Sequence, residues 1–331
     1  MVTQKDVARA AGVSQPTVSL VLNGGPNMPL PETTVEKVMT VMDRMGYRPN
    51  RLAQALRTNR TNTIACLIPD ITNPFYPSFV RGVQSAAEAQ KYDVITVNTD
   101  GARSRELHYL ELARQGRVDG FVGSFHGITS RDIDHIEQLE VPIVRLEPSQ
   151  KKINSFWLDD VYVDNFKAMQ ELTQFLINKG HQQLTIVSGR GGPERVRLAG
   201  YEAAMAINNL NPKVQLVDKF DEISGYSASK IILNKPNRPT AIIAANDLMA
   251  IGAMRASKEE GLSIPKDIAV AGFDNIPVSQ LVFPSLTTVE RYQNKRGVLA
   301  VNLLLGRLQS KKKLPRQLAE GDYKIIERDS T

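Results

Sequence analysis

The chain has 331 residues, of which 42% are hydrophobic and 23% are charged, and its formal net charge is +6. This length predicts two or three folding units, because single hydrophobic cores stop growing near roughly 250 to 300 residues. No run of about 18 apolar residues is present, which argues against a transmembrane helix, and residues 1–5 do not read as a signal peptide. We therefore expect a cytoplasmic protein that makes no membrane contact.

The residue types also disfavour an enzyme or a metal protein. Cys66 is the only cysteine, which excludes an internal disulfide, and its apolar neighbours in residues 63–68 predict a buried core residue. The four histidines show no metal-ligand spacing, and neither a P-loop nor a dinucleotide-binding fingerprint is present. Residues 189–192, Gly-Arg-Gly-Gly, read as a loop that only weakly favours phosphate. We expect no catalytic residue, no metal and no cofactor.

Residues 1–23 read as two short helices joined by a tight turn. Thr3 is a plausible first N-cap with Asp6 at the capping-box position, and Ser14 is a second N-cap. Apolar residues repeat at helical spacing in both segments, and Gly12 lies in the turn. The second segment begins with short polar residues, as a recognition helix does when its N-terminal end meets base edges in the major groove. The pattern predicts a helix-turn-helix; the alternative is a helical hairpin that only decorates a larger domain.

The distribution of charge favours the DNA-binding interpretation. Residues 1–60 contain eight lysines or arginines and four acidic residues, a net charge of +4, which leaves only +2 of the total +6 for the other 271 residues. A basic N-terminal segment followed by a nearly neutral remainder is typical of a module that contacts DNA phosphates. We therefore expect residues 1–60 to include the part of the protein that contacts DNA.

Two further helices are predicted before Thr63, where the pattern of apolar residues changes. Valines and methionines recur every three or four residues over residues 32–45, and this helix ends at Gly46. Residues 50–57 favour a helix too short to be stable alone in water. The polar residues 58–62 look like a linker. We expect the 50–57 helix to become ordered only on DNA.

From Thr63 onward, short apolar runs alternate with longer amphipathic stretches, which predicts parallel sheets covered by helices on both faces. Six or more such units exceed one small sheet, so we expect two doubly wound subdomains. The predicted strands are 63–68, 92–97, 120–123, 142–146, 184–187, 240–244 and 268–271. The predicted helices are 77–90, 104–115, 166–179, 196–207, 223–233 and 247–260.

Polar and aromatic residues directly follow several of these predicted strands. They are Asp70, Asn73, Phe75, Tyr76, Ser124, Asn246, Asp247, Asp274 and Asn275. Ligands of such folds bind outside the carboxyl ends of the strands, and carboxylates and amides beside rings are typical of a site for a polyol. The alternative is that Asn246, Asp247 and Asp274 simply cap the helices that follow them. Taken as a set, these residues favour a ligand cleft.

Short motifs along the whole chain occur in a specific order and spacing. They lie at residues 6–8, 12–14, 17–19, 46–50, 73–76, 118–120, 180–181, 197–201, 245–247, 272–275 and 286–289. With these motifs, the chain resembles the lactose-repressor (LacI/GalR) family of bacterial transcription regulators from end to end. A periplasmic sugar-binding protein would share the body of this fold but would lack the basic N-terminal segment.

The resemblance implies a small all-α helix-turn-helix head at residues 1–48, a hinge helix and linker at 49–60, and an α/β body at 61–331. The body would be a periplasmic-binding-protein-like domain of two doubly wound parallel-sheet subdomains, which binds the effector and forms a homodimer. The N-subdomain would comprise about 61–161 and 291–320, and the C-subdomain about 162–290 and 321–331. The implied partners are double-stranded operator DNA, a small-molecule effector and a second copy of the chain.

The resemblance also assigns DNA contacts. It places base contacts at Gln15, Pro16 and Leu20 of the second helix, but Pro16 has no donor and Leu20 stands where a polar or basic residue is common, so the operator sequence stays open. The remaining DNA-binding positions are Thr3, Ser14, Thr17, Asn23 and Asn50. Leu56 matches the hinge leucine that wedges into the minor groove and kinks the DNA; the alternative is that Leu56 is buried against its own head.

For the effector, the resemblance implies rings from Phe75, Tyr76 and Phe220 beside Ser124. Arg197 would be the main charged anchor, although a structural salt bridge is its alternative role, and Asn246 and Asp274 would accept hydrogen bonds. We expect a repressor of a metabolic operon that is released from its operator by a carbohydrate. The alternative is a corepressor-type regulator tightened on DNA by a purine, a nucleoside, a phosphorylated ligand or a protein co-effector.

Overall fold

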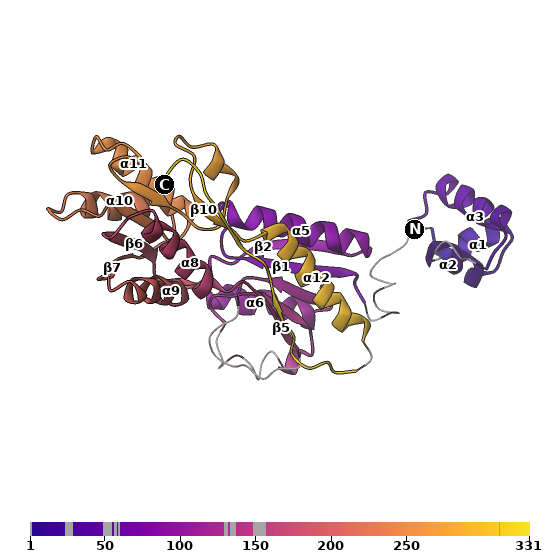
Figure 1. Cartoon of the computed structure of the whole chain (residues 1–331). Coiled ribbons are helices and arrows are strands. Elements are labelled where there is room, and N and C mark those ends of the chain that lie inside the picture. The colour runs from indigo at the N-terminus through magenta and orange to yellow at the C-terminus, as the bar shows by residue number, and fades with distance from the viewer. Residues whose placement is uncertain are drawn as a thin grey trace. The chain divides into compact units, whose positions relative to one another are not determined.

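The computed structural model describes residues 2–23, 29–48, 55, 58, 60–128, 132, 137–147, 157–310 and 312–331. The chain divides into two compact units, Met1–Thr61 and Asn62–Thr331, and each is described by itself. Figure 1 labels the helices and strands of both units. Among the described residues, no helix is both long and apolar enough to cross a membrane.

The described part of the first unit includes the helices α1 (Gln4–Ala11), α2 (Gln15–Asn23) and α3 (Glu32–Arg44). The predicted capping box at α1 is confirmed, because the Asp6 N–H donates to Thr3 Oγ1 at 3.3 Å and the Thr3 N–H donates to Asp6 Oδ2 at 3.0 Å. Gly12 turns the chain with a φ of +64°, and the Thr17 N–H donates to Ser14 Oγ at 3.3 Å.

A small apolar core holds these three helices together. Its buried members are Val7, Ala8, Ala11, Val18, Val21, Val38, Val41, Met42 and Tyr47. The apolar residues recur at helical spacing, so each helix turns one face to this core. This unit is the helix-turn-helix that the sequence predicts. The predicted hinge helix lies outside the described residues apart from Ala55, so its residues Asn50 and Leu56 are not described.

The second unit contains a six-stranded sheet in which every pairing is parallel. Its order is β11-β5-β4-β3-β1-β2. The strands are β1 (Thr63–Ile68), β2 (Asp93–Asn98), β3 (Gly120–Gly123), β4 (Ile143–Leu146), β5 (Leu158–Tyr162) and β11 (Leu318–Glu320). Helices α5 (Phe75–Ala89) and α12 (Gln293–Gln309) pack on one another and share a core with this sheet, whereas α6 (Arg103–Arg114) belongs to a second apolar cluster.

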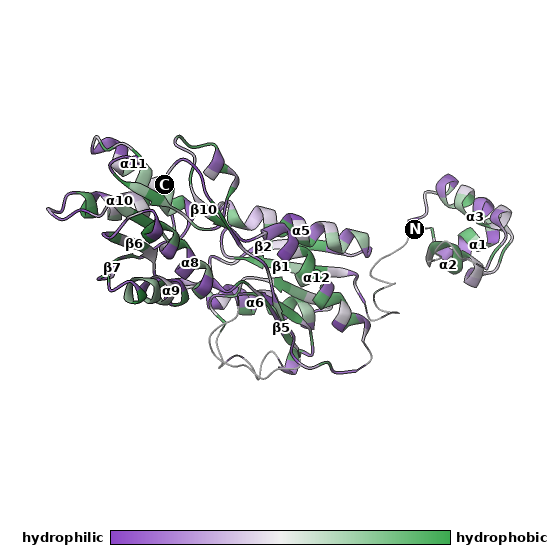
Figure 2. Ribbon diagram, in the orientation of Figure 1, coloured by the Kyte–Doolittle hydropathy of each residue, from purple (hydrophilic) through white to green (hydrophobic). Residues whose placement is uncertain are grey.

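A four-stranded parallel sheet of order β7-β6-β8-β9 forms the other half of this unit. The strands are β6 (Leu184–Gly189), β7 (Lys213–Val217), β8 (Ala241–Ala244) and β9 (Ala269–Ala271). Alternate residues of β8 point to opposite faces, because Ile242 packs with α10 (Glu222–Leu233) and α11 (Asp247–Glu259), whereas Ile243 packs with α8 (Asn165–Asn178) and α9 (Glu194–Ile207). Figure 2 shows green, apolar strands between helices that carry purple, polar residues.

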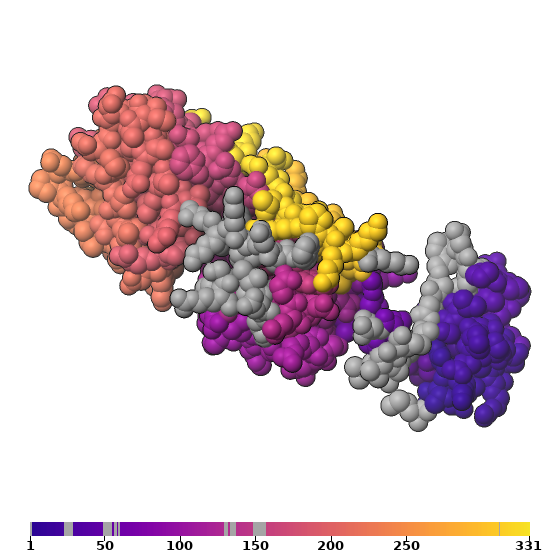
Figure 3. Space-filling view, turned by 90° about the horizontal axis from the view of Figure 1, so that it is seen from below, coloured from indigo at the N-terminus to yellow at the C-terminus, as the bar shows by residue number. Residues whose placement is uncertain are grey.

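The chain passes between the two halves of this unit three times, after β5, after β10 (Thr288–Glu290), which belongs to a separate two-stranded sheet, and after β11. β10 pairs antiparallel with β12 (Lys324–Ile326), and a short 3₁₀ helix, η2 (Pro277–Gln280), lies between β9 and β10. In Figure 3, the yellow C-terminal segment lies along the magenta residues of the same unit, as the parallel pairing of β11 with β5 requires.

The prediction of two doubly wound parallel-sheet subdomains is confirmed, and the bounds of β1 and β3 are those predicted. Cys66 is buried, as expected, and burial raises the pKa of its thiol to about 12. The sequence did not predict β5, β7, β10, β11, β12 or α12. The cause is clearest for β5, where Asp159 and Asp160 interrupt an otherwise apolar run although both are fully buried in the fold.

Candidate functional site

The predicted base-contacting residues of α2 lie outside its core face. Gln15 and Pro16 are exposed, and Leu20 is 44% exposed, whereas Val18 and Val21 are buried. An apolar side chain left in solvent at this position is free to contact a thymine methyl group. The outer face of α2 can therefore enter a groove without disturbing the core of the unit.

Two of the predicted phosphate-contacting residues, Ser14 and Thr17, lie at the start of α2, and a third, Thr3, caps α1. Thr3 and Ser14 are exposed, and the Oγ of Ser14 lies 2.8 Å from Oγ1 of Thr17. Hydroxyl and backbone donors at a helix N-terminus suit a phosphate group. The side chain of Asn23 lies outside the described residues, as Asn50 does.

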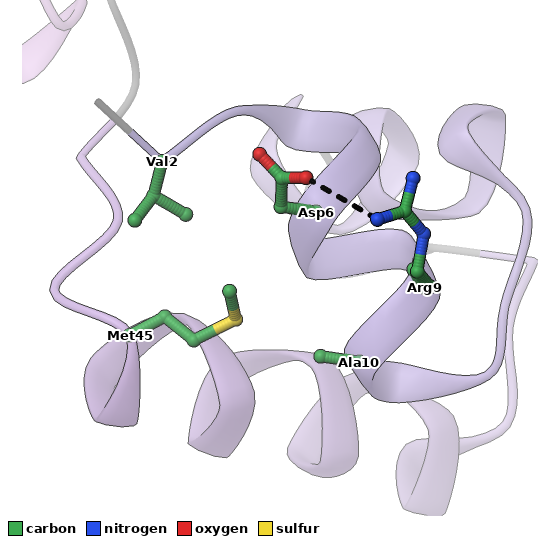
Figure 4. Close-up of a pocket in the computed structure, with 5 residues that line it drawn as sticks. All are labelled: Val2, Asp6, Arg9, Ala10 and Met45. Atoms are coloured by element: carbon green, nitrogen blue, oxygen red, sulfur yellow. Dashed lines mark ion pairs between the residues drawn. The ribbon is translucent and has the colours of Figure 1, made fainter.

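The first unit also carries a hollow, lined by Val2, Asp6, Arg9, Ala10 and Met45 (Figure 4). Arg9 Nη1 lies 3.8 Å from Asp6 Oδ1, and the side chain of Arg9 is 83% exposed. An exposed ion pair of this kind contributes little to stability, because solvent screens it. With one exposed ion pair and no aromatic ring, this hollow lacks the convergent polar groups of a small-molecule site.

A cavity of about 490 Å³ lies between the two sheets of the second unit. Its lining residues follow the carboxyl ends of strands in both sheets, which is where ligands of open α/β sheets bind. All seven predicted effector residues line it: Phe75, Tyr76, Ser124, Arg197, Phe220, Asn246 and Asp274. Other lining residues are Asp70, Asn73, Asp100, His126, Glu147, Arg190, Lys219, Asp221 and Arg291.

Aromatic rings border this cavity on both sides. Phe75 and Tyr76 begin α5 and meet edge to face, with ring centroids 5.0 Å apart. Phe220 lies on the opposite side, after β7, and its ring passes close to Gly189. A Cβ at position 189 would lie 2.5 Å from the Phe220 ring, so glycine is required there for this ring to keep its place.

Asp274 is held between two guanidinium groups inside the cavity. Its Oδ1 accepts hydrogen bonds from Arg197 Nη2 at 3.3 Å and from Arg291 Nη1 at 2.9 Å. Asp274 has a φ of +114°, and its backbone conformation is therefore strained. Strain of this kind is typical of functional sites, where the surrounding structure fixes it.

Arg197 is almost fully buried and uses its other donors within the protein. Its Nε donates to Asn165 Oδ1 at 3.1 Å, its Nη1 donates to the Ala245 carbonyl, and its guanidinium stacks 4.0 Å above the Phe273 ring. Burial lowers its pKa to about 10, although the nearby Asp274 carboxylate acts in the opposite direction. Arg197 thus combines both roles considered from the sequence: it lines the cavity and makes a buried salt bridge.

Glu147 and Arg291 are cavity residues that the sequence did not reveal. Glu147 directly follows β4 and accepts hydrogen bonds from Arg291, from Arg296 and, at 2.7 Å, from Asn165 Nδ2. Burial alone would raise the pKa of Glu147, but the surrounding guanidinium groups outweigh it and lower that pKa. Its place after a predicted strand was the available signal, whereas no local signal marks Arg291.

The loop after β3 places Ser124 and His126 in the cavity. Ser124 Oγ lies 3.0 Å from His126 Nε2. The buried Glu106 carboxylate accepts three backbone N–H bonds, from His126, Gly127 and Ile128, at 2.8 to 3.0 Å. Burial among the cavity walls lowers the pKa of His126, which favours its neutral form. The loop is therefore held rigidly and presents a neutral imidazole.

The alternative that Asn246 is a helix cap is also realised. Its Oδ1 accepts the Met249 N–H at 2.9 Å at the start of α11, while its Nδ2 donates to the Phe220 carbonyl at 2.9 Å. Asn246 therefore caps a helix and lines the cavity at the same time. Asp247 is not a cap, because its two oxygens accept hydrogen bonds from the Ile276 N–H and the Thr288 hydroxyl.

We expect the free energy of unfolding to depend on the charge of Asp247. Burial, followed by the nearby charge of Asp274, raises the pKa of Asp247 from 3.8 to about 7. The folded state then keeps a proton that the unfolded state releases, so stability falls as pH rises from about 4 to about 7. Asp247→Asn removes this titration, and Thr288 can reverse its hydrogen bond to accept from the amide.

The advantage of the Asn variant over the natural chain should therefore grow by about 2 kcal/mol between pH 5 and pH 8. Urea unfolding of both proteins at the two pH values measures this difference. An equal difference at both pH values would contradict the raised pKa.

Within the described residues, no group of three His, Cys, Asp or Glu side chains is arranged to hold a metal ion. In the glycine-rich loop after β6, two backbone amides are already used: the Arg190 N–H donates to the Val217 carbonyl at 2.9 Å, and the Gly191 N–H donates to Glu194 Oε2 at 2.6 Å. The cavity therefore offers arginines, carboxylates, amides and rings as its recognition groups.

Comparisons with known proteins place both units in one family. Residues 3–50 match the bacterial regulatory proteins, lacI family, and residues 173–331 match the periplasmic binding protein-like domain. The chain is 33% identical to catabolite control protein A of Priestia megaterium, with 100% of this chain and 99% of that protein covered. It is 35% identical to the ribose operon repressor of Escherichia coli K12, with 93% of each chain covered.

Solved structures of similar chains agree with this assignment. The lac repressor dimer bound to operator and the anti-inducer ONPF matches with a TM-score of 0.86 at 27% identity, over 99% of this chain and 98% of that one. A LacI family transcriptional regulator from Enterococcus faecium with bound ribose matches with a TM-score of 0.73 at 30% identity, over 81% of this chain and 98% of that one. The chain therefore belongs to the LacI family and is a DNA-binding transcription regulator, not an enzyme.

Proposed function

We propose that the protein is a dimeric repressor of a metabolic operon, released from a palindromic operator when a carbohydrate binds in the cavity of the second unit. The observation that carries this proposal is the lining of that cavity. Rings from Phe75, Tyr76 and Phe220 stand around charged and amide groups. Such a combination suits a polyol, because rings cover apolar sugar faces while carboxylates and guanidiniums make charge-assisted bonds to hydroxyls.

In the first unit, we assign base contacts to Gln15, Pro16 and Leu20 and phosphate contacts to Thr3, Ser14 and Thr17. The exposed outer face of α2 supports this assignment. Asn23 and Asn50 are assigned to DNA from the family resemblance alone. A two-fold dimer presents two such helices to two half-sites, which explains why we expect a palindromic operator.

The proposed mechanism is a change in the relative angle of the two subdomains. The cavity is lined by residues from both sheets, so a ligand bound there contacts both subdomains at once. A ligand shifts such an equilibrium only through a difference in affinity between the two arrangements. In the repressor we propose, the carbohydrate favours the arrangement that does not bind the operator.

A second copy of the chain is the proposed partner of an apolar surface on the second unit. Phe283 is 98% exposed and Leu281 is 78% exposed, both in the segment that follows η2. Side chains as apolar as these are typical anchors of a protein interface.

Phe283→Ser should therefore weaken the dimer by about 10-fold or more, because an aromatic anchor contributes about 2 kcal/mol. Sedimentation equilibrium measures this effect. Ile207→Ser is the matched control, since Ile207 is 68% exposed at the end of α9 and should leave the dimer unchanged. An unaltered dimer in Phe283→Ser would remove this segment from the interface.

A thermal-shift screen tests the assignment of the effector. The panel contains sugars, sugar acids, sugar phosphates, polyols, nucleosides and purine bases. A ligand present at about 100 times its dissociation constant adds about 2.7 kcal/mol to the folded state, which is a clear shift of the melting temperature. We expect a carbohydrate to give that shift. A response to purine bases alone would replace this proposal by the corepressor alternative.

A further inference from the structure

Five charged side chains that contact one another are here called the inner cluster; four of them line the cavity, and Arg296 joins them through its ion pair with Glu147. They are Arg197, Arg291, Arg296, Glu147 and Asp274. The three arginine side chains are only 2 to 3% exposed. Three guanidinium groups face two carboxylates, so the inner cluster carries a net charge of +1. Charge buried in this way is costly unless an opposite charge compensates it.

The protein itself supplies few acceptors for this excess charge. Both oxygens of Glu147 already accept hydrogen bonds, and Oδ1 of Asp274 is shared by two arginines. Among the described residues, five buried side-chain polar atoms have no hydrogen-bond partner, and three of them are donors of the inner cluster: Nε of Arg291 and both Nε and Nη1 of Arg296. Unsatisfied buried donors are rare in native proteins and call for a further acceptor.

The pKa values agree with an under-compensated cluster. Burial lowers the pKa of Arg197 to about 10 and that of Arg296 to about 10, although carboxylates lie near both. Burial acts on Arg291 in the same direction, but there the charges of Glu147 and Asp274 outweigh it and raise the pKa. Two of the three guanidiniums are therefore destabilised as cations by their surroundings.

The other acids near the cavity do not neutralise the inner cluster. Asp70 and Asp100 are exposed at the rim, where Asp70 accepts hydrogen bonds from Thr72 and Asp100 is paired with Arg105. Asp221 caps α10. Charges exposed at a rim are screened by solvent far more strongly than a buried cluster is. A bound ligand is therefore the natural source of the compensating charge.

We infer that the effector is a sugar acid, a polyhydroxylated molecule with one carboxylate, and that Arg291 is the residue that selects this charge. This inference rests on the proposed function. Arg291 lines the cavity with its guanidinium 5.1 Å from the Phe75 ring centroid, beside one of the rings assigned to the sugar. A carboxylate brings one negative charge and two acceptors, which matches a net charge of +1.

A phosphorylated sugar fits this arrangement less well. A phosphate group carries about −1.5 to −2 charges at neutral pH, which exceeds the excess charge of the inner cluster. In the glycine-rich loop beside the cavity, the Gly191 N–H is taken by Glu194, and Nε of Arg190 already lies 3.8 Å from Asp218 Oδ1.

Calorimetric titration of the full-length dimer tests the inference with matched pairs of ligands. The pairs are D-glucuronate with D-glucose and D-galacturonate with D-galactose, with D-gluconate and glucose 6-phosphate as further probes. At least one sugar acid should bind about 10-fold or more tightly than its neutral parent, because charge-assisted bonds are the stronger class. This preference should shrink as salt rises from about 50 to about 500 mM, as expected for an ionic contact.

Two variants test whether Arg291 is responsible for the preference for a sugar acid over its neutral parent. Arg291→Gln should reduce the ratio of acid to neutral affinity to about 3-fold or less. Arg195→Gln is the matched control, because Arg195 is an exposed arginine of α9 that does not line the cavity, and it should leave the ratio unchanged. The salt dependence of the natural chain remains informative if Arg291→Gln fails to fold.

The possible outcomes separate the inference from the proposed function. Neutral sugars that bind as tightly as their acids, or glucose 6-phosphate as the preferred probe, would overturn the sugar acid while leaving a carbohydrate-responsive repressor. An unchanged ratio in Arg291→Gln would overturn the role of Arg291. No binding of any sugar, acid or sugar phosphate would contradict the proposed function itself.

Discussion

Arg197→Gln should abolish the response to effector while leaving a folded protein. The guanidinium of Arg197 lines the cavity and anchors three groups from separate elements, Asn165, Ala245 and Asp274. Its loss removes a charged donor from the effector and loosens the carboxylate beside it. We expect effector affinity to fall by about 100-fold, which corresponds to about 3 kcal/mol.

The same substitution should lower the free energy of unfolding by about 2 kcal/mol, because the shorter glutamine leaves the buried Asn165 Oδ1 and Ala245 carbonyl without the donors that Arg197 supplies. Asp274 retains its bond to Arg291, so complete unfolding is not expected. Calorimetric titration with the effector measures the affinity, and urea unfolding of the same preparation measures the free energy of unfolding. Arg195→Gln, on the same helix, is the control for both. Full effector affinity in a destabilised Arg197→Gln would make this arginine a structural residue only.

Leu56→Ala should lose about 100-fold of specific operator affinity, or about 3 kcal/mol, while its affinity for random DNA stays the same. Leu56 lies outside the described residues, and this prediction follows from its match to the hinge leucine of the family. An apolar wedge offsets the cost of unstacking one base step, because the bend that it makes brings more protein surface against the DNA.

Fluorescence anisotropy with an operator selected from random duplexes and with a scrambled duplex measures this effect. The variant should stay dimeric and should bind effector normally, because the substitution is outside the second unit. Operator affinity close to that of the natural chain would show that Leu56 is not a wedge.

Local sequence patterns predicted the strands whose burial is purely apolar. β1 and β3 are short runs of small and apolar residues, and their predicted bounds match the structure. β5 was not predicted, because Asp159 and Asp160 stand where a buried strand normally carries apolar residues. Their charges are compensated by arginines of other segments: Arg307 binds Asp159, while Arg145 of β4 and Arg316 bind Asp160.

β7 and α12 were also not predicted, and for a similar reason. β7 is an edge strand whose first residues, Lys213 and Val214, are exposed, so it lacks the apolar run of a central strand. In α12, Arg296 and Arg307 are buried although arginines normally mark an exposed helix face. Contacts with residues distant in sequence stabilise both β7 and the buried arginines of α12. The periodicity of apolar residues along the chain does not reveal such contacts.

The cavity residues also divide into those that a local sequence pattern predicts and those that it does not. The rule that ligands bind beyond strand ends brought together residues such as Ser124 and Asp274, and it would have included Glu147 had it been applied after β4. Arg291 follows no strand of either parallel sheet, and its position depends on Glu147, which lies 144 residues away. Residues that complete a site by pairing with one another are visible only once the chain is folded.

The most direct test of the proposed repressor measures how operator DNA and the carbohydrate change the affinity of the protein for each other. Operator affinity is measured by anisotropy with and without the carbohydrate that gives the largest thermal shift, and the affinity for that carbohydrate is then measured with and without operator. We predict that the carbohydrate weakens operator binding by about 10-fold or more, and that the operator weakens carbohydrate binding by the same factor. Operator affinity that stays unchanged, or becomes tighter, at saturating carbohydrate would contradict a repressor released by a carbohydrate.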